Sequence, residues 1–360
     1  MLNEALGEKA KKTLIGFVEK INPMLEKYWD DEISNSFGFN ETQQQLVKKM
    51  LLHARSHNLV GGKRIRGAFV YYGYGLGEAV VDERIWKAAM AVELVHTALL
   101  MHDDFMDEDK LRRGKPTTHE YFAKGDKHYG EAMAVNVGDA VLCLGYEMLM
   151  DCGFESDRVI MAMKKLLRGI TNTTYGQAYD VSLPKSGDMT EEKVMSLHKA
   201  KTAIYTYENP LFIGGILGGL GEKELSILHE YSMKGGVAFQ LQDDILGIYG
   251  ESEKTGKSDD SDLLQGKSTL LIIKAMEMGN SEQKSAIGDV WGNKVASALQ
   301  IELAKKAIKD SGSYEYSVKV AKRLAREAVI EARKLREWDM NSNSVDFIEG
   351  VAEYMVDREV

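Results

Sequence analysis

The segment "HDDFMDEDKLRRGKPTTHE" (102–120) crowds acidic side chains behind an apolar run and follows them with Arg112 and Arg113. Like charges repel at this density, so the cluster is costly unless cations lie among the carboxylates. Asp103 and Asp107 are four residues apart, which on a helix places both on one face, one turn apart. Their oxygens suit a hard divalent cation, above all Mg²⁺, which keeps several waters and is usually shared with substrate phosphates.

A second acidic pair stands far along the chain. The segment "LQDDILG" (241–247) carries Asp243 and Asp244 directly after an apolar run, with Gln240 one helical turn before the pair. Either pair alone is typical of a solvated helix end or a salt-bridged surface. Two pairs, each closing a mostly apolar helical stretch, favour two helices that bracket a cluster of divalent cations.

Basic residues indicate which anion such metals would share. The segment "GGKRIRG" (61–67) places Lys63, Arg64 and Arg66 behind a glycine pair, where backbone amides can also approach a phosphate. Further cations are Lys201, Lys257 and Lys267. Any one of these is most often an ordinary surface charge. Together with the two acidic pairs they predict a site for two diphosphates, one held by metal ions and the other mainly by arginine and lysine.

The elements that must position these groups are helices. Apolar residues recur at helical spacing, strand-like alternation is nearly absent, and only 4 of the 360 residues are proline. The segments 88–109 and 224–250 are apolar on nearly all sides, which predicts two helices buried in a protein interior. Asn40 and Thr190 are expected to begin two other helices. No repeat or proline-rich linker offers a boundary, so we predict a single all-α domain over residues 1–360.

Composition narrows the class of protein. Hydrophobic residues make up 44% and charged residues 28% of the chain, as in a globular protein, and the net charge of −9 argues against nucleic acid as a partner. The N-terminus lacks the apolar core of a secretory signal, and the uncharged stretch 209–221 is too short and glycine-rich to span a bilayer. We therefore expect a cytoplasmic protein without stable membrane insertion. Cys143 and Cys152 fit no zinc or redox spacing and are expected to be buried thiols.

In order and spacing these motifs resemble those of the all-trans isoprenyl diphosphate synthases, the family that contains farnesyl and geranylgeranyl diphosphate synthases. "HDDFMDEDKLRRGKPTTH" is similar to the first aspartate-rich motif of that family, DDxxD followed by RRGxPT. "GVAFQLQDDILGIYG" is similar to the second motif, and "GGKRIR" to the glycine-lysine-arginine signature near the N-terminus. The resemblance covers the motif-bearing part of the chain, 60–275.

The resemblance implies the isoprenoid synthase fold, a single large bundle of long helices around a central apolar cavity with the two aspartate motifs at its mouth. It also implies a reaction, the head-to-tail condensation of isopentenyl diphosphate with an allylic diphosphate (dimethylallyl, geranyl or farnesyl). The implied cofactor is Mg²⁺, with about three ions per site and Mn²⁺ able to substitute. The implied assembly is a homodimer.

Roles carry over from the family to the matching positions. The implied metal ligands are Asp103, Asp104, Asp107, Asp243 and Asp244. The implied contacts of the leaving diphosphate are Arg112, Lys201 and Lys257, with Lys267 as a further one. Thr202 and Gln240 match positions that stabilise the carbocation through oxygen dipoles. The implied pocket for the second, homoallylic diphosphate consists of Lys63, Arg66, His96 and Arg113.

Product length follows from the same resemblance. In the family, side chains upstream of the first aspartate motif form the floor of the product cavity. Aromatic residues four and five positions before its first aspartate stop the chain at short products. Here these positions hold Leu99 and Ala98, with Val95 further back. The absence of an aromatic floor implies geranylgeranyl diphosphate or a longer product.

Two positions depart from the family pattern. Gly67 stands where the family usually has proline, which we expect to affect a turn more than a ligand. Gly247 ends the second motif in place of a third aspartate, a variant common in the prokaryotic branch, and it leaves open whether this position touches metal.

Three alternatives fit the sequence less well. A terpene cyclase on the same fold would carry a second motif of the Asn-Ser/Thr-Glu kind and would not need the basic pocket. A non-catalytic or regulatory subunit of a heteromeric synthase usually loses one aspartate motif, and both are intact here. A phosphate-loop hydrolase is suggested by "GESEKTGKS" (250–258), but Glu251 stands where that loop needs glycine.

Overall fold

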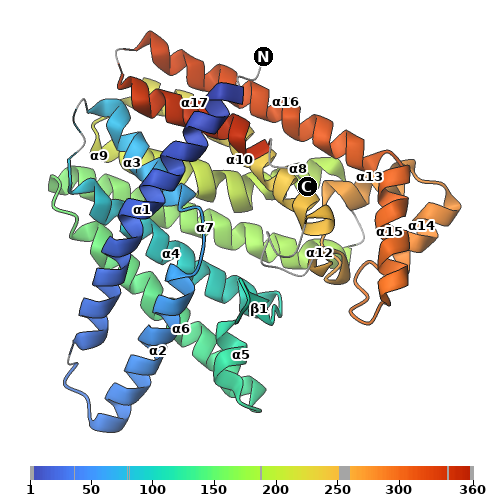
Figure 1. Ribbon diagram of the computed structural model, residues 1–360, viewed down its shortest axis with the longest axis horizontal. Coiled ribbons are helices and arrows are strands. Elements are labelled where there is room, and N and C mark those ends of the chain that lie inside the picture. Colours follow the sequence, from blue (N-terminus) through green and yellow to red (C-terminus); the bar gives the residue numbers. More distant parts are fainter. Residues whose placement is uncertain are drawn as a thin grey trace. The chain divides into compact units, whose positions relative to one another are not determined.

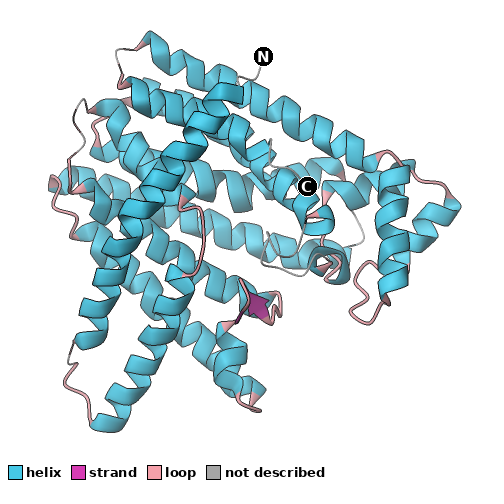
Figure 2. Ribbon diagram, viewed as in Figure 1, coloured by secondary structure: helices cyan, strands magenta, loops and turns pink. Residues whose placement is uncertain are grey.

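Long helices make up most of the chain (Figure 1). The computed structural model describes residues 4–35, 37–78, 80, 82–186, 189–250, 260–338 and 340–356. Within these ranges the only strands form one short antiparallel hairpin (Figure 2), which confirms the all-α prediction. Contacts divide the chain into two compact units, named here for the aspartate motif that each contains. That one domain covers residues 1–360 stays a prediction.

The first-motif unit comprises Lys12–Lys164 and Ile213–Gly219. Its elements are most of α1 (Glu4–Ser34), α2 (Glu41–Leu59), α3 (Ile65–Gly77), α4 (Ile85–Met106), β1 (Leu111–Arg112), β2 (Lys115–Pro116), α5 (Thr118–Ala123), α6 (Lys127–Met150), the start of α7 (Ser156–Ser186) and the end of α9 (Asn209–Leu217). Asn40 begins α2, as predicted, through a capping box with Gln43.

Helix α4 is the buried helix predicted over 88–109, and its C-terminal end carries the first aspartate motif. It packs against α3 and α6, and its core side chains face neighbours on nearly every side. The helix ends at Met106, three residues earlier than predicted. Gly145 of α6 allows the close approach, because a Cβ there would lie 2.6 Å from Val95 Cγ2.

The glycines of the stretch 209–221 serve packing inside this unit. A Cβ on Gly214 would lie 2.7 Å from the backbone nitrogen of Tyr74 in α3, and one on Gly218 would lie 2.6 Å from the Tyr74 carbonyl oxygen. Helix α9 therefore needs residues without a side chain where it crosses α3.

The second-motif unit comprises Met1–Lys11, Lys165–Phe212 and Leu220–Val360. Its further elements are α8 (Glu191–His198), the π-helix η1 (Lys199–Glu208), α10 (Glu222–Tyr249), α12 (Ser261–Leu264), α13 (Leu270–Met278), α14 (Ser281–Gly288), α15 (Ala298–Asp310), α16 (Ser313–Arg333), the 3₁₀-helix η2 (Lys334–Glu337) and α17 (Ser342–Val356). Helix α10 is the helix predicted over 224–250, and it packs against α16, α17 and η1.

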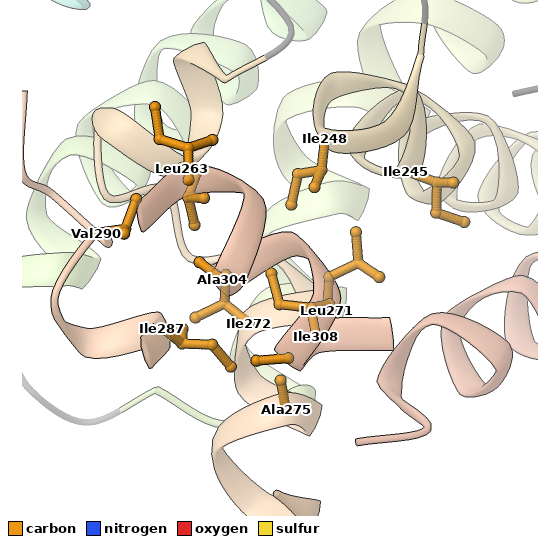
Figure 3. Close-up of a cluster of buried hydrophobic side chains, with 12 residues drawn as sticks. Ile245, Ile248, Leu263, Leu271, Ile272, Ala275, Ile287, Val290, Ala304 and Ile308 are labelled. Atoms are coloured by element: carbon orange, nitrogen blue, oxygen red, sulfur yellow. The ribbon is translucent and has the colours of Figure 1, made fainter. Parts of the chain in front are cut away.

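An aliphatic cluster holds the C-terminal end of α10, which carries the second aspartate motif. Ile245 and Ile248 of α10 belong to one buried cluster with Leu263 of α12 and Leu271 of α13 (Figure 3). These side chains are at most 1% exposed. Burial on this side fixes the helix and leaves the aspartates on its other faces.

Helix α8 begins with Thr190 as its N-cap, as predicted, but the turns that follow are not α-helical. Lys199–Glu208 form a π-helix of ten residues. Such wide turns are rare and often lie at functional sites. The sequence pattern did not reveal them, since apolar residues keep to one side of a segment this short in either kind of helix.

Two further expectations concern exposure. Cys152 is buried, but Cys143 is exposed, so the expectation of two buried thiols is wrong for Cys143 because it lies on the open face of α6. In the described part of the chain, α6 is also the one helix that is long and apolar enough to cross a membrane. Of its most apolar 18-residue segment, 44% is buried in the structure. Core helices of globular proteins commonly have these properties.

Candidate active site

Asp103 and Asp107 occupy the last turn of α4. Asp107 is the C-cap residue, and its backbone N–H donates to the Asp103 carbonyl oxygen at 2.8 Å. The helical spacing that the sequence implied is therefore kept although the helix ends one residue before Asp107. Both side chains are partly exposed, as a carboxylate that binds an external cation must be.

Asp104 differs from these two aspartates. Its side chain is 1% exposed, and Arg112 Nε donates to its Oδ1 atom at 2.5 Å. Burial raises the pKa of Asp104, and the Arg112 charge works against that rise. The hairpin of β1 and β2 delivers Arg112 to this position, and Thr117 secures the hairpin by donating to the Asp109 carbonyl oxygen at 2.6 Å.

Arg113, the next residue, contacts the glycine pair of the GGKRIR signature. Its Nη1 atom donates to the carbonyl oxygens of Val60 and Gly61 at 2.6 and 2.7 Å. Gly62 has a φ of +112°, and a Cβ there would lie 3.1 Å from both Arg113 Nη atoms. The glycine is required by its conformation and by this contact. Lys63, the residue after this glycine pair, is exposed.

Four arginines surround His96 with positive charge. Arg66 Nη1 lies 3.0 Å from His96 Nε2, and because a guanidinium only donates, Nε2 is the acceptor. Burial, and then the charges of Arg66, Arg113, Arg112 and Arg64, hold the pKa of His96 well below its ordinary value. A neutral ring among several cations is an environment that favours a bound anion.

The predicted floor residues lie one to two turns before Asp103 on α4. Ala98 and Val95 are fully buried and Leu99 is partly buried. Val95 faces Gly145 of α6, because a Cβ atom on Gly145 would lie 2.6 Å from Val95 Cγ2.

In the second-motif unit, the π-helix η1 presents Lys201 and Thr202. Lys201 Nζ lies 2.7 Å from Asp180 Oδ2 of α7. Gly176, one turn before Asp180, allows this approach, since a Cβ there would lie 3.0 Å from the Lys201 Cα atom. The Thr202 hydroxyl donates to Gln240 Oε1 of α10 at 2.6 Å.

Asp243 and Asp244 also differ from each other. Asp243 is partly exposed, whereas Asp244 is 6% exposed and accepts a hydrogen bond from Gln240 Nε2 at 2.8 Å. His198, the last residue of α8, brings its Nε2 atom to 3.2 Å from Asp244 Oδ2. One polar chain therefore runs from Thr202 through Gln240 and Asp244 to His198.

Gly247, which ends the second motif, lies close to a carboxylate of the same unit. A Cβ at Gly247 would collide with the carboxylate of Asp262 in α12. Asp262 in turn pairs with Lys267 at 3.1 Å, and Trp291 Nε1 donates to the Lys267 carbonyl oxygen at 3.0 Å. A side chain at position 247 would therefore require the Asp262 carboxylate to move.

The structure thus gathers the predicted residues into two groups, one in each unit. The first-motif unit holds Lys63, Arg66, His96, Asp103, Asp104, Asp107, Arg112 and Arg113. The second-motif unit holds Lys201, Thr202, Gln240, Asp243, Asp244 and Lys267. Lys257 lies outside the described residues.

Asp180, His198 and Asp262 were missed at the sequence level. Asp180 ends "GQAYD", a polar interruption in a helix, and His198 precedes Lys201 by about one helical turn. Asp262 belongs to the acidic run "SDDSD" and reads as an ordinary solvated charge. Only the first two carried a signal that could have been used.

Each unit by itself offers donors that fit a metal whose ligands are shared with substrate. Among the described residues no three His, Cys, Asp or Glu side chains are grouped so that they could hold an ion by themselves. The partly exposed Asp103, Asp107 and Asp243 offer oxygen ligands only, and Asp104 Oδ2 is buried without a hydrogen-bond partner in the described chain. Oxygen ligands completed by water and phosphate are what Mg²⁺ takes.

The fold is all-α, and the C-terminal ends of α4 and α10 each carry an aspartate motif. Basic residues of the GGKRIR signature lie in the same unit as the first motif. These features define an isoprenoid-synthase-type protein. The polyprenyl synthetase family model matches residues 48–308. The chain therefore belongs to the polyprenyl synthetase family, the all-trans isoprenyl diphosphate synthases, and is a chain-elongating trans-prenyltransferase.

Individual relatives cover most of the chain. The geranylgeranyl diphosphate synthase of Saccharolobus solfataricus is 34% identical over 279 residues, 76% of this chain and 80% of the relative. The geranylfarnesyl diphosphate synthase of Aeropyrum pernix is 32% identical over 304 residues, 83% of this chain and 91% of the relative. A crystal structure of geranylgeranyl pyrophosphate synthase from Corynebacterium glutamicum, complexed with isoprenyl diphosphate and magnesium, matches with a TM-score of 0.87 at 26% identity, covering 95% of this chain and 99% of that one. The predicted fold class is confirmed.

Proposed function

We propose that this enzyme condenses isopentenyl diphosphate with an allylic diphosphate (dimethylallyl, geranyl or farnesyl) and that its product is geranylgeranyl diphosphate or longer. The observation that carries the proposal is the match to synthases with these product names over more than three quarters of the chain. The two groups of site residues support it, because each pairs accessible carboxylates or oxygen dipoles with cations suited to a diphosphate.

The proposed metal ligands are Asp103, Asp107 and Asp243, for Mg²⁺ or Mn²⁺ and about three ions. When bound, the ions would neutralise the negative charge that develops on the departing diphosphate. Asp104 and Asp244 were expected to join these ligands. Their burial and their bonds to Arg112 and Gln240 support an indirect role, in which each carboxylate orients its partner.

Arg112, Lys201 and Lys257 are proposed to grip the leaving diphosphate, with Lys267 as a further contact. Asp104 holds the Arg112 guanidinium from one side, and Asp180 holds the Lys201 ammonium. A cation held in this way is already oriented before substrate arrives, which reduces the entropy cost of binding.

Thr202 and Gln240 are proposed to stabilise the allylic carbocation. The Thr202 hydroxyl proton points to Gln240 Oε1, so the remaining lone pairs of the hydroxyl oxygen are available to face a positive charge. Gln240 is itself fixed because its amide nitrogen donates to Asp244. Apolar helix surfaces would exclude water from the cation.

Lys63, Arg66, His96 and Arg113 are proposed to bind the diphosphate of isopentenyl diphosphate. The low pKa of His96 keeps its ring neutral near pH 7, so that it can take part in hydrogen bonding while the arginines supply the charge. The released diphosphate would accept the final proton, so the reaction needs no separate side-chain base.

A homodimer in the cytoplasm is the proposed state of the enzyme. The open face of α6 supports the dimer, since Val135 and Met150 are 42% and 57% exposed and Cys143 lies between them along the helix. Such a face also accounts for the apolar composition of α6 without membrane insertion. Light scattering should give about twice the 40.2 kDa of one chain, and Val135→Glu should shift the mass toward one chain. A wild-type mass near 40.2 kDa would refute the dimer.

Incubation with labelled isopentenyl diphosphate and farnesyl diphosphate tests the reaction. We expect label in dephosphorylated alcohols of geranylgeranyl length or longer, resolved by chromatography. Release of cyclic hydrocarbons, or no incorporation with Mg²⁺ present, would contradict the proposal.

A further inference from the structure

His198 stands at the junction between α8 and the π-helix that presents Lys201 and Thr202. Its side chain is 6% exposed and its Nε2 atom lies 3.2 Å from Asp244 Oδ2. Nothing in the proposed reaction uses this histidine. A buried imidazole beside a buried carboxylate nevertheless requires a reason, since both groups lose water on burial.

Asp244 supplies that reason through its two oxygens. Oδ1 accepts from Gln240 Nε2 at 2.8 Å, whereas Oδ2 is buried and accepts no hydrogen bond from the described residues. The one ion-pairing group that the described chain places near Oδ2 is His198. A carboxylate held at one oxygen can still turn about its Cβ–Cγ bond, and a second partner at the other oxygen removes that freedom.

The orientation of Asp244 decides the orientation of Gln240. An amide whose nitrogen donates to Asp244 must present its oxygen on the other side, where Thr202 donates to it at 2.6 Å. If Asp244 turned, the amide could flip and present N–H groups to the carbocation instead of a carbonyl dipole.

We propose that His198 is a positioning residue: its Nε2 atom, at ion-pair distance from Asp244 Oδ2, holds that carboxylate and thereby locks the Thr202–Gln240–Asp244 chain in the arrangement that stabilises the allylic cation. This inference rests on the proposed function of Thr202 and Gln240. An ionised carboxylate only accepts, so the nitrogen that faces it must carry the proton.

Two substitutions of His198 distinguish the loss of its hydrogen-bond donor from a change in side-chain volume. His198→Leu removes the donor and keeps a buried apolar volume, whereas His198→Gln retains an N–H donor near the place of Nε2. We expect His198→Leu to lower kcat about 10- to 100-fold, as loss of a supporting contact typically does, with an unchanged KM for isopentenyl diphosphate. His198→Gln should restore most of kcat. In an Asp244→Asn background His198→Leu should have no further effect.

His229→Leu is the matched control. His229 Nδ1 lies 2.8 Å from Glu208 Oε1 in the same unit, and within the described residues this pair makes no hydrogen bond or ion pair with Thr202, Gln240 or Asp244. Lys165 Nζ also lies 3.0 Å from Glu208 Oε2, so Glu208 keeps a cationic partner in this variant. We expect wild-type kcat for this variant.

A readout without turnover completes the test. Long-range proton–nitrogen NMR of histidine-labelled protein, assigned with His198→Gln, should show a proton on Nε2 of His198, and the signal should move in Asp244→Asn. Wild-type kcat in folded His198→Leu, equal losses in the Leu and Gln variants, or a neutral ring protonated on Nδ1 alone would each overturn the proposal. Failure of the wild type to elongate any substrate would instead overturn the proposed function and leave the NMR result to decide on His198.

Discussion

Arg64 and Glu93 form a buried ion pair that ties the GGKRIR signature to α4. Arg64 Nη1 lies 3.2 Å from Glu93 Oε2, and the side chains are 4% and 3% exposed. The other oxygen of Glu93 accepts the Gly67 backbone N–H at 2.8 Å, a bond that proline could not donate. The departure at Gly67 therefore lies inside α3 and affects this contact, not a turn as expected.

Replacement of Glu93 by glutamine should lower the free energy of unfolding by about 3 kcal/mol or more, because the Arg64 charge would remain buried without compensation. Urea denaturation followed by circular dichroism measures the loss. Glu26→Gln is the control, since Glu26 pairs at 2.8 Å with Arg55 but is 57% exposed. That change should cost about 1 kcal/mol or less. Equal losses in the two variants would contradict the role of the buried pair.

Asp103→Ala and Asp243→Ala should each lower kcat about a thousandfold, and the wild type should require Mg²⁺ or Mn²⁺. Loss of a ligand removes several kcal/mol of stabilisation of the leaving group, and about 1.4 kcal/mol corresponds to a factor of ten in rate. Turnover of metal-stripped protein with and without added ions measures both effects. The exposed Asp31 serves as a control, and Asp31→Ala should keep wild-type kcat. Near-normal turnover in either site variant would remove that aspartate from the metal site.

His53 should make folding stability depend on pH. Its Nε2 atom lies 3.1 Å from Thr118 Oγ1, and burial, followed by the positive charges of His57, Lys115 and Lys49, lowers the pKa of His53 to about 3. The unfolded chain binds this proton near the ordinary value of 6.5. Between these values the unfolded state holds more protons, so stability is full above about 6.5 and falls as the pH drops toward about 3.

His53→Gln tests this linkage because glutamine retains a polar contact and cannot titrate. The urea midpoint of the variant should change less than that of the wild type between about pH 7 and pH 5. Some slope should remain, since burial also lowers the pKa of His57. Identical slopes in the two proteins would show that His53 does not contribute.

The motifs could be predicted from the sequence because their chemistry depends on residue types at short helical spacing. Asp103 and Asp107 are separated by one turn, and that geometry holds whatever packs around α4. The difference within each pair of adjacent aspartates, one partly exposed and the other buried, could not be predicted. The hairpin returns Arg112 to the buried Asp104, and α8 brings His198 beside the buried Asp244 of α10, and neither contact between separate elements follows from residue spacing.

The supporting residues were missed for a related reason. Asp180 precedes Lys201 by 21 residues, and its role depends on how α7 packs against the π-helix. Asp262 matters because α12 brings its carboxylate against Gly247. Contacts between separate helices leave no periodic trace in one sequence, so the partners of Asp180 and Asp262 could be recognised only from the structure, although Asp180 itself interrupts a helix as a polar residue.

Product length should respond to Ala98. This fully buried residue precedes Asp103 by five positions, about 7.5 Å along α4 at 1.5 Å per residue. An aromatic ring at this depth would occupy space that a growing prenyl chain needs, so Ala98→Phe should shift the products toward farnesyl diphosphate. Ala98→Val adds less volume and should shorten the products less, so product length should fall as the side chain at position 98 becomes larger. Chromatography of dephosphorylated products measures the distribution, and thermal unfolding confirms that the variants fold despite the added bulk. If the wild type stops at farnesyl diphosphate, or if folded Ala98→Phe makes wild-type products, Ala98 is not the floor, and the limit on chain length must come from side chains on another helix.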